Sequence, residues 1–191
     1  EIGRTLETMM GSRQVTRYID DGEEYDVMLQ AARDDRMEPD DLSNTWVRGT
    51  HSESAVEGYF GLGEEHTHRN DDTYTLDHPV EFASEDHGPT PVEYVLVGLA
   101  GCLTAGIAAV AQNRGIQLNS VKATLEGDLN ILGILGGDPE VRNGFNQVRV
   151  HYDIDADASE EDIEALVAQS QKRSAVFDIV TNPTNVAVTV N

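Results

Sequence analysis

The sequence predicts an α+β fold, in which strands pack around one long apolar helix. Residues 90–115 contain no charged side chain between Tyr94 and Ala111, and a helix that is apolar on every side is typical of a buried element. Residues 146–155 alternate apolar and polar side chains, as a strand with one buried face does, whereas residues 159–173 follow a helical spacing. Together these segments indicate an α+β domain built around a long buried central helix.

The central helix has signals at both ends. Thr90 to Glu93 combine an N-cap residue, a proline at the first helical position and a glutamate that completes a capping box, and Arg114-Gly115 is typical of a helix end. Small side chains recur every fourth residue in two rows, which allows another backbone to approach closely. The rows are Gly98, Cys102 and Gly106, and Gly101, Ala105 and Ala109.

A membrane span is the alternative interpretation of this segment, since about 20 apolar residues cross a bilayer. The segment is rich in Gly and Ala, however, and no basic cluster is present to set an orientation. We therefore expect a buried helix of a soluble protein and no membrane span. The residues that flank the segment are acidic: Glu81, Glu85, Asp86 and Glu93.

Acidic residues dominate the composition. The chain has 35 acidic and 13 basic side chains, a formal net charge of −22, and only Lys122 and Lys172 are lysines. This charge repels nucleic acid, so no nucleic-acid partner is expected. The acids are spread along the whole chain, which favours the solvated acidic surface of a halophilic protein, because at 1 M salt a Debye length of about 3 Å screens the self-repulsion.

Cys102 is the one cysteine in the sequence, which excludes an intramolecular disulfide. Without a recognisable signal peptide, the expected location is the reducing cytoplasm. The glycines at 133, 136 and 137 are not followed by the Lys-Ser/Thr pair of a phosphate-binding loop. No cofactor is therefore expected.

Residues 1–45 are expected to form a separate N-terminal segment. Val15–Ile19 and Tyr25–Leu29 predict a hairpin closed by an Asp-Gly turn, and residues 38–42 predict a turn or the start of a helix. The stretches GRTLETMMGSRQVTRYIDDGEEYDVMLQ and PDDLSNTWVRG resemble part of the docking region of RND-type efflux transporters. No transmembrane helices accompany these stretches, so the resemblance does not imply transport. The segment is either a fused appendage or a docking element for a partner.

Residues 46–191 form the expected second domain. Strands are predicted at 46–50, 55–60, 73–76 and 80–82, with a polar loop at 64–72. Beyond the central helix, strands are predicted at 121–131, 146–155 and 186–190, a helix at 159–173 and a turn at 181–184.

The order of motifs in this second domain resembles the OsmC/Ohr family. The motifs are GPTPVEYVLVGLAGCLTAGIAAVAQNRGI, EGDLNILGILG, VRNGF and RSAVFDIVTNPTNVAV. The resemblance covers about residues 46–191. It implies an OsmC/Ohr-like fold, with an antiparallel sheet around the long buried central helix, and an intertwined homodimer with the two central helices packed at its centre.

The resemblance also implies roles for individual residues. In peroxidatic members of the family, a cysteine in the central helix attacks an organic hydroperoxide, and a second cysteine resolves the sulfenic acid. Cys102 falls on the first position and Ser174 on the resolving position. A hydroxyl cannot take part in thiol–disulfide exchange, so turnover would need an external thiol reductant.

Relatives lower the pKa of this cysteine with an arginine from an early strand, which a glutamate at the start of the central helix holds. Glu93 and Arg48 are the expected residues, and Arg69 is the second choice for the arginine. The Ohr branch places its acid one position earlier, at Val92 in this chain, so Glu93 could be only a capping residue. Either arginine could be a solvated surface residue, and Cys102 a small buried hydrophobe.

Five histidines lie between residues 51 and 87. Two of them could pair on a metal ion with neighbouring acids, but their spacing matches no standard zinc motif, and we expect no metal site. The histidines are His51, His66, His68, His78 and His87, the candidate pair is His66 and His68, and the neighbouring acids are Glu64, Glu65 and Asp72.

Two classes of function follow from these expectations, and whether the chain is an enzyme stays open between them. The first is a stress-response thiol peroxidase of the organic hydroperoxide reductase type, which lacks the resolving cysteine and uses Cys102 with an external thiol. The second is a catalytically inactive dimeric OsmC-like protein that binds a small apolar ligand and in which Cys102 is structural.

Overall fold

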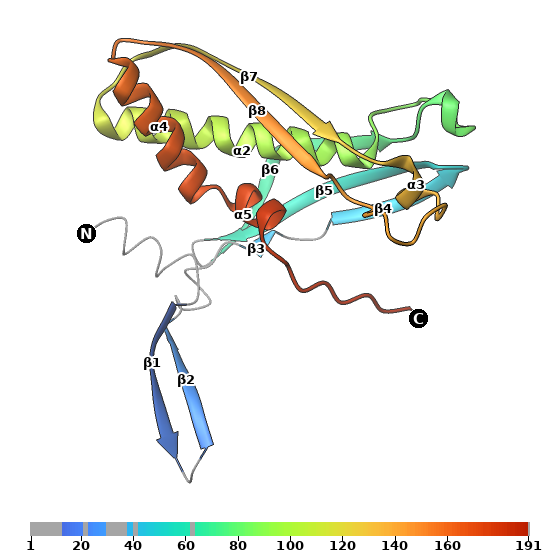
Figure 1. Ribbon diagram of the computed structural model, residues 1–191, viewed down its shortest axis with the longest axis horizontal. Coiled ribbons are helices and arrows are strands. Elements are labelled where there is room, and N and C mark those ends of the chain that lie inside the picture. Colours follow the sequence, from blue (N-terminus) through green and yellow to red (C-terminus); the bar gives the residue numbers. More distant parts are fainter. Residues whose placement is uncertain (1–12, 21–22, 30–37, 40–41, 62–63, 191) are drawn as a thin grey trace. The chain divides into compact units, whose positions relative to one another are not determined.

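The computed structural model describes residues 13–20, 23–29, 38–39, 42–61 and 64–190. The chain divides into two compact units, Glu1–Thr90 and Pro91–Asn191, and each unit is described by itself below (Figure 1). The domain boundary that the sequence indicates between residues 45 and 46 stays a prediction.

The N-terminal hairpin is confirmed. β1 (Arg13–Asp20) pairs antiparallel with β2 (Glu23–Leu29). The turn residues 21–22 lie outside the described residues. The resemblance of this segment to a transporter docking region stays a prediction.

An antiparallel sheet follows in the first unit. Its central strand is β5 (His51–Gly61), which pairs with β6 (Glu64–Leu76) along its length and with β4 (Leu42–Arg48) and β3 (Glu38–Pro39) at its two halves. Two expectations are therefore wrong. Residues 38–39 are a strand and not a turn or helix start, and the expected polar loop belongs to β6, because pairing with β5 outweighs the low strand propensity of its acidic residues.

The segment that follows β6 folds around Asp77. The buried carboxylate of Asp77 accepts hydrogen bonds from hydroxyl and amide groups on both sides of it. The donors are the hydroxyls of Ser84 (2.5 Å) and Thr50 (2.7 Å) and the amides of His78 (2.8 Å) and His87 (3.1 Å). The expected strand at residues 80–82 is wrong: Val80–Phe82 form the 3-10 turn η2, because a backbone that curls around Asp77 cannot remain extended.

The second unit is built on α2 (Pro91–Arg114), which confirms the central helix. β7 (Leu118–Asp128) and β8 (Gln147–Ala156) form an antiparallel hairpin, and both the hairpin and α4 (Glu160–Arg173) pack on α2 (Figure 1). The short helix α3 (Ile131–Ile134) lies between the two strands in sequence.

The structure of the C-terminal region differs from the expectation. Residues 175–181 form a helix, α5 (Ala175–Thr181), that the sequence pattern does not predict. The expected strand at 186–190 is wrong, since residues 183–190 form no regular element in the described chain. Their valines are exposed to 74% (Val186), 85% (Val188) and 94% (Val190), so an alternating pattern without a pairing partner is not sufficient to make a strand.

One face of α2 supplies the core of the second unit. Its buried residues are Leu99, Leu103, Ile107, Val110 and Ala111, and Leu166 of α4 joins the last two in a cluster. The opposite face is exposed, including Val97 at 61%. The sequence predicts that α2 is buried on every side. Within a single chain, one face of α2 is buried and the opposite face is exposed. Among the described residues, α2 is the one helix whose length and composition also suit a membrane span.

Candidate functional site at the junction of α2 and α5

Helix α4 crosses close to α2 at Gly106. A Cβ atom on Gly106 would lie 2.3 Å from Oγ of Ser170, so a larger residue cannot be accommodated without movement of α4. The Ser170 hydroxyl donates a 2.6 Å hydrogen bond to the carbonyl of Leu103. The first predicted row of small residues therefore does allow a close approach, and the element that approaches belongs to the same chain.

Cys102 and Ser174, the two positions singled out by the resemblance, lie in direct contact. The Ser174 hydroxyl donates a hydrogen bond to Sγ of Cys102 over 3.1 Å. Ser174 is also the N-cap of α5, where its Oγ accepts a hydrogen bond from the Phe177 amide. Because that contact uses a lone pair, the one hydroxyl proton is available for the sulfur.

The pKa of the Cys102 thiol reflects opposing effects. Burial raises this pKa, but the hydrogen bond from Ser174 and the backbone amides of Val176 and Ala175 lower it, and the net result lies below the ordinary value for cysteine. Cys102 is partly exposed. A partly exposed thiol with a lowered pKa has the environment of a reactive cysteine, whereas a structural cysteine is buried in apolar surroundings.

The amide groups that lower the pKa of Cys102 come from the start of α5 and not from the start of α2. Cys102 lies eleven residues after Pro91, and the dipole effect of a helix end fades within its first turn. The amides that act on the sulfur belong to α5 instead. Sequence reasoning missed α5, because Ser174 is the only clear start signal and no Glu or Gln stands three residues later to complete a capping box.

Arg48 lies in β4 and is paired within the first unit. Its Nη2 forms an ion pair with Oε2 of Glu85 and lies 3.3 Å from Nε2 of His87. Glu85 Oε2 is also 2.7 Å from that same His87 nitrogen. Sequence reasoning did not assign a role to Glu85, which is distant from Arg48 in sequence. The position of Glu85 beside Arg48 depends on how the segment around Asp77 folds.

The other predicted site residues are placed as follows. Glu93 lies in the first turn of α2 and Arg69 in β6, where both residues are exposed. The rings of His66 and Tyr59 are stacked with centroids 5.1 Å apart, and His68 contacts the same tyrosine at 5.4 Å. In the described part of the chain, no three His, Cys, Asp or Glu side chains converge as metal ligands would.

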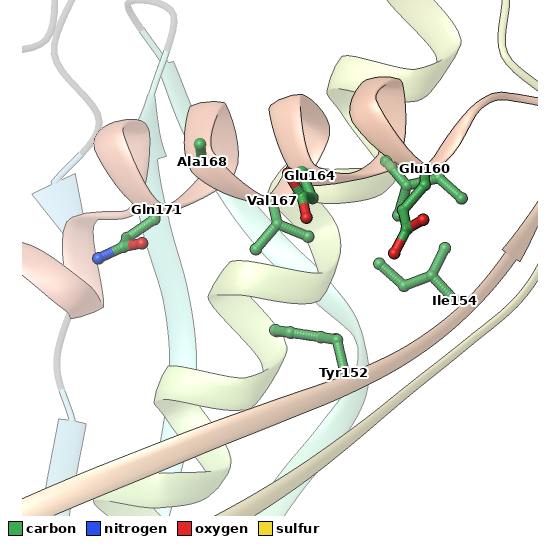
Figure 2. A pocket seen from close by; sticks show the side chains of 8 residues that line it. Tyr152, Ile154, Glu160, Glu164, Val167, Ala168 and Gln171 are labelled. Atoms are coloured by element: carbon green, nitrogen blue, oxygen red, sulfur yellow. The ribbon is translucent and has the colours of Figure 1, made fainter.

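A cleft of mixed polarity in the second unit lies between β8 and α4. Tyr152 and Ile154 of β8 face Val167, Glu164 and Glu160 of α4 across a space of about 530 Å³ (Figure 2). A second cavity of about 250 Å³ shares Tyr152 and Val167 with this cleft and is lined also by Leu103, Val150 and Phe177.

Comparison with known proteins gives the class of the chain. Residues 84–189 match the family model of the OsmC-like proteins, and the chain belongs to this family. The matched residues include the whole of α2. No curated protein matches the sequence.

Solved structures share the fold at low sequence identity. An OsmC-like protein from Mycoplasma pneumoniae superimposes with a TM-score of 0.57 at 19% identity, over 74% of this chain and 86% of that one. An OsmC-like protein from Vibrio cholerae gives a TM-score of 0.55 at 9% identity, over 72% of this chain and 90% of the other. These matches confirm the α+β OsmC-like fold.

Proposed function

We propose that the chain is a thiol-dependent peroxidase of the OsmC-like family, in which Cys102 reduces an organic hydroperoxide. The observation that carries this proposal is the environment of the sulfur. A hydroxyl at 3.1 Å and two amides lower the pKa of a partly exposed thiol, and the thiolate is the nucleophilic form of cysteine.

The proposed reaction has two stages. The thiolate attacks one oxygen of the hydroperoxide, the O–O bond breaks, and the leaving alkoxide takes up a proton and departs as an alcohol, while Cys102 becomes a sulfenic acid. An external thiol then attacks that sulfur, water leaves and a mixed disulfide forms. A second external thiol releases the Cys102 thiol and departs with the first as a disulfide. A small-molecule thiol or a protein thiol could supply both equivalents.

Arg48 is the arginine proposed to assist this reaction, with Arg69 as the second choice, and Glu93 is the proposed acid of α2. The pairing of Arg48 with Glu85 and His87 supports the choice, because it holds the guanidinium in one orientation. Exposed Arg69 serves as the matched comparison: Arg48→Ala is expected to slow oxidation of Cys102, and Arg69→Ala to leave the rate unchanged.

The central test is consumption of an alkyl hydroperoxide by the full chain in high salt with dithiothreitol as reductant. We expect turnover by the wild type, background consumption by Cys102→Ser, and a mass increase of one oxygen on Cys102 when the reductant is omitted. Equal consumption by wild type and variant would refute the proposal.

A homodimer is part of the proposal. The second row of small residues on α2, Gly101, Ala105 and Ala109, is exposed along its length, and no atom lies within 4 Å of a Cβ placed on Gly101. An exposed apolar helix face of this kind fits the packing of a second copy. Sedimentation in high salt should show a dimer that Ala105→Glu weakens and that Thr124→Glu, which adds the same charge at an exposed position of β7 away from this helix face, leaves intact.

The second candidate function is the binding of a small apolar ligand, with Cys102 structural. The cavity beside Leu103 and Phe177 favours it, since apolar clefts with a few polar groups are typical ligand sites. Slow alkylation of Cys102 together with the absence of peroxide chemistry would favour this function over the peroxidase. The cytoplasm is the proposed location for either function.

A further inference from the structure

We propose that Ser174 is a positioning residue for Cys102: its hydroxyl holds the sulfur by a direct hydrogen bond and stabilises the anionic form of the cysteine. The proposal rests on the proposed function, because stabilising the anion matters for activity only if Cys102 reacts. It gives a role to a residue that the family resemblance identifies only as the lost resolving position.

The first support is the geometry of the hydroxyl. Ser174 is 6% exposed, so little water competes for its proton. Its Oγ is fixed by the Phe177 amide at 3.1 Å and lies 3.1 Å from Sγ of Cys102. With one lone pair already accepting, the hydroxyl donates its single proton to the sulfur.

The second support comes from the charged side chains of α2 and of the elements packed against it in the second unit. α2 has no charged residue between Tyr94 and Ala111. The elements packed against α2 carry charged side chains that are exposed and are not among the groups that shift the pKa of Cys102. Those nearest Ser174 in sequence are Lys172, Arg173 and Asp178, and those of β7 are Lys122, Glu126 and Asp128.

The test measures how fast iodoacetamide alkylates Cys102 in the folded full chain as a function of pH. Removing the donor in Ser174→Ala should move the midpoint of the profile to higher pH and slow alkylation at neutral pH by about three- to ten-fold, the effect of losing one hydrogen bond. Ser174→Thr keeps a hydroxyl and should keep the wild-type midpoint. Ser174→Gly should behave like Ser174→Ala, although glycine is an adequate N-cap and preserves the start of α5.

Ser159→Ala is the matched control, because Ser159 caps α4 in the same way through the Asp162 amide. It should lose a comparable amount of stability without moving the midpoint. An unchanged midpoint in folded Ser174→Gly, or an equal shift in Ser159→Ala, would overturn the proposal. The same experiments distinguish a failure of the proposed function. If the alkylation midpoint shifts in Ser174→Gly but the wild type consumes no peroxide, the positioning role is supported and the peroxidase activity is refuted.

Discussion

Replacing Gly106 by alanine tests the packing on which the site depends. The added Cβ would lie 2.3 Å from Oγ, 3.1 Å from Cβ and 3.4 Å from Cα of Ser170. Because the last two atoms belong to the first part of the side chain and to the backbone of α4, a rotamer change alone cannot relieve the clash. Helix α4 has to move away from α2, which also breaks the hydrogen bond from Ser170 to Leu103.

The expected cost combines three effects. Overpacking costs about 1–3 kcal/mol, the lost hydrogen bond costs about 1 kcal/mol, and the better helix propensity of alanine returns about 1 kcal/mol. Gly106→Ala should therefore reduce the free energy of unfolding by about 1–3 kcal/mol. The measurement is urea unfolding followed by circular dichroism at one protein concentration and fixed high salt.

Gly98 is the matched control on the same face of α2. A Cβ there meets only the Val176 side chain, at an ordinary contact of 3.9 Å, so Gly98→Ala should be neutral or stabilise the fold by up to about 1 kcal/mol. In a Gly106→Ala/Ser170→Ala double variant, the loss should be smaller than the sum of the single losses, because the hydroxyl in the way is gone. A Gly106→Ala variant as stable as Gly98→Ala would refute the reasoning.

Two further predictions concern charge. Raising the salt concentration from about 0.1 M to about 1 M shortens the Debye length from about 10 Å to about 3 Å. Because the chain has a net charge of −22, its thermal unfolding midpoint should rise as the self-repulsion is screened. An equal or lower unfolding midpoint in high salt would contradict the halophilic interpretation. The hydrogen bond from Ser84, with those from His87, Thr50 and His78, keeps the pKa of Asp77 well below its usual range against the effect of burial. A depressed pKa contributes stability that is present above the unfolded-state pKa of about 4 and is lost as the pH falls through the folded-state pKa. Asp77→Asn should therefore be less stable than the wild type at neutral pH, and the difference in stability should shrink in acid. A difference in stability that stays constant down to acid pH would exclude this cause.

The sequence predicts those elements whose signals are local. The start of α4 shows this, because the Ser159 hydroxyl accepts the Asp162 amide as the capping pattern predicts. The central helix likewise begins at Pro91 and ends at Arg114 as expected. In both cases the pattern within one turn of the chain specifies the structure.

Elements that depend on distant partners could not be predicted in this way. β6 becomes a strand because β5 pairs with it, and Val80–Phe82 turn because the carboxylate of Asp77 collects donors from Thr50 to His87. At the site, the position of Cys102 could be predicted from the family motif. Its contact with Ser174, 72 residues away, and the pairing of Arg48 with Glu85 depend on tertiary structure.

A serine in contact with Cys102, in place of a second cysteine, also affects how long the oxidised state of the protein lasts. If Cys102 reacts as proposed, a chain with a single cysteine has no internal route from the sulfenic acid to a disulfide, so an oxidised molecule would wait for a thiol to arrive by diffusion. The dwell time of the oxidised state is then inversely proportional to the concentration of reduced thiol around the protein. A protein of this kind would record the redox state of its surroundings in the fraction of its molecules that are oxidised.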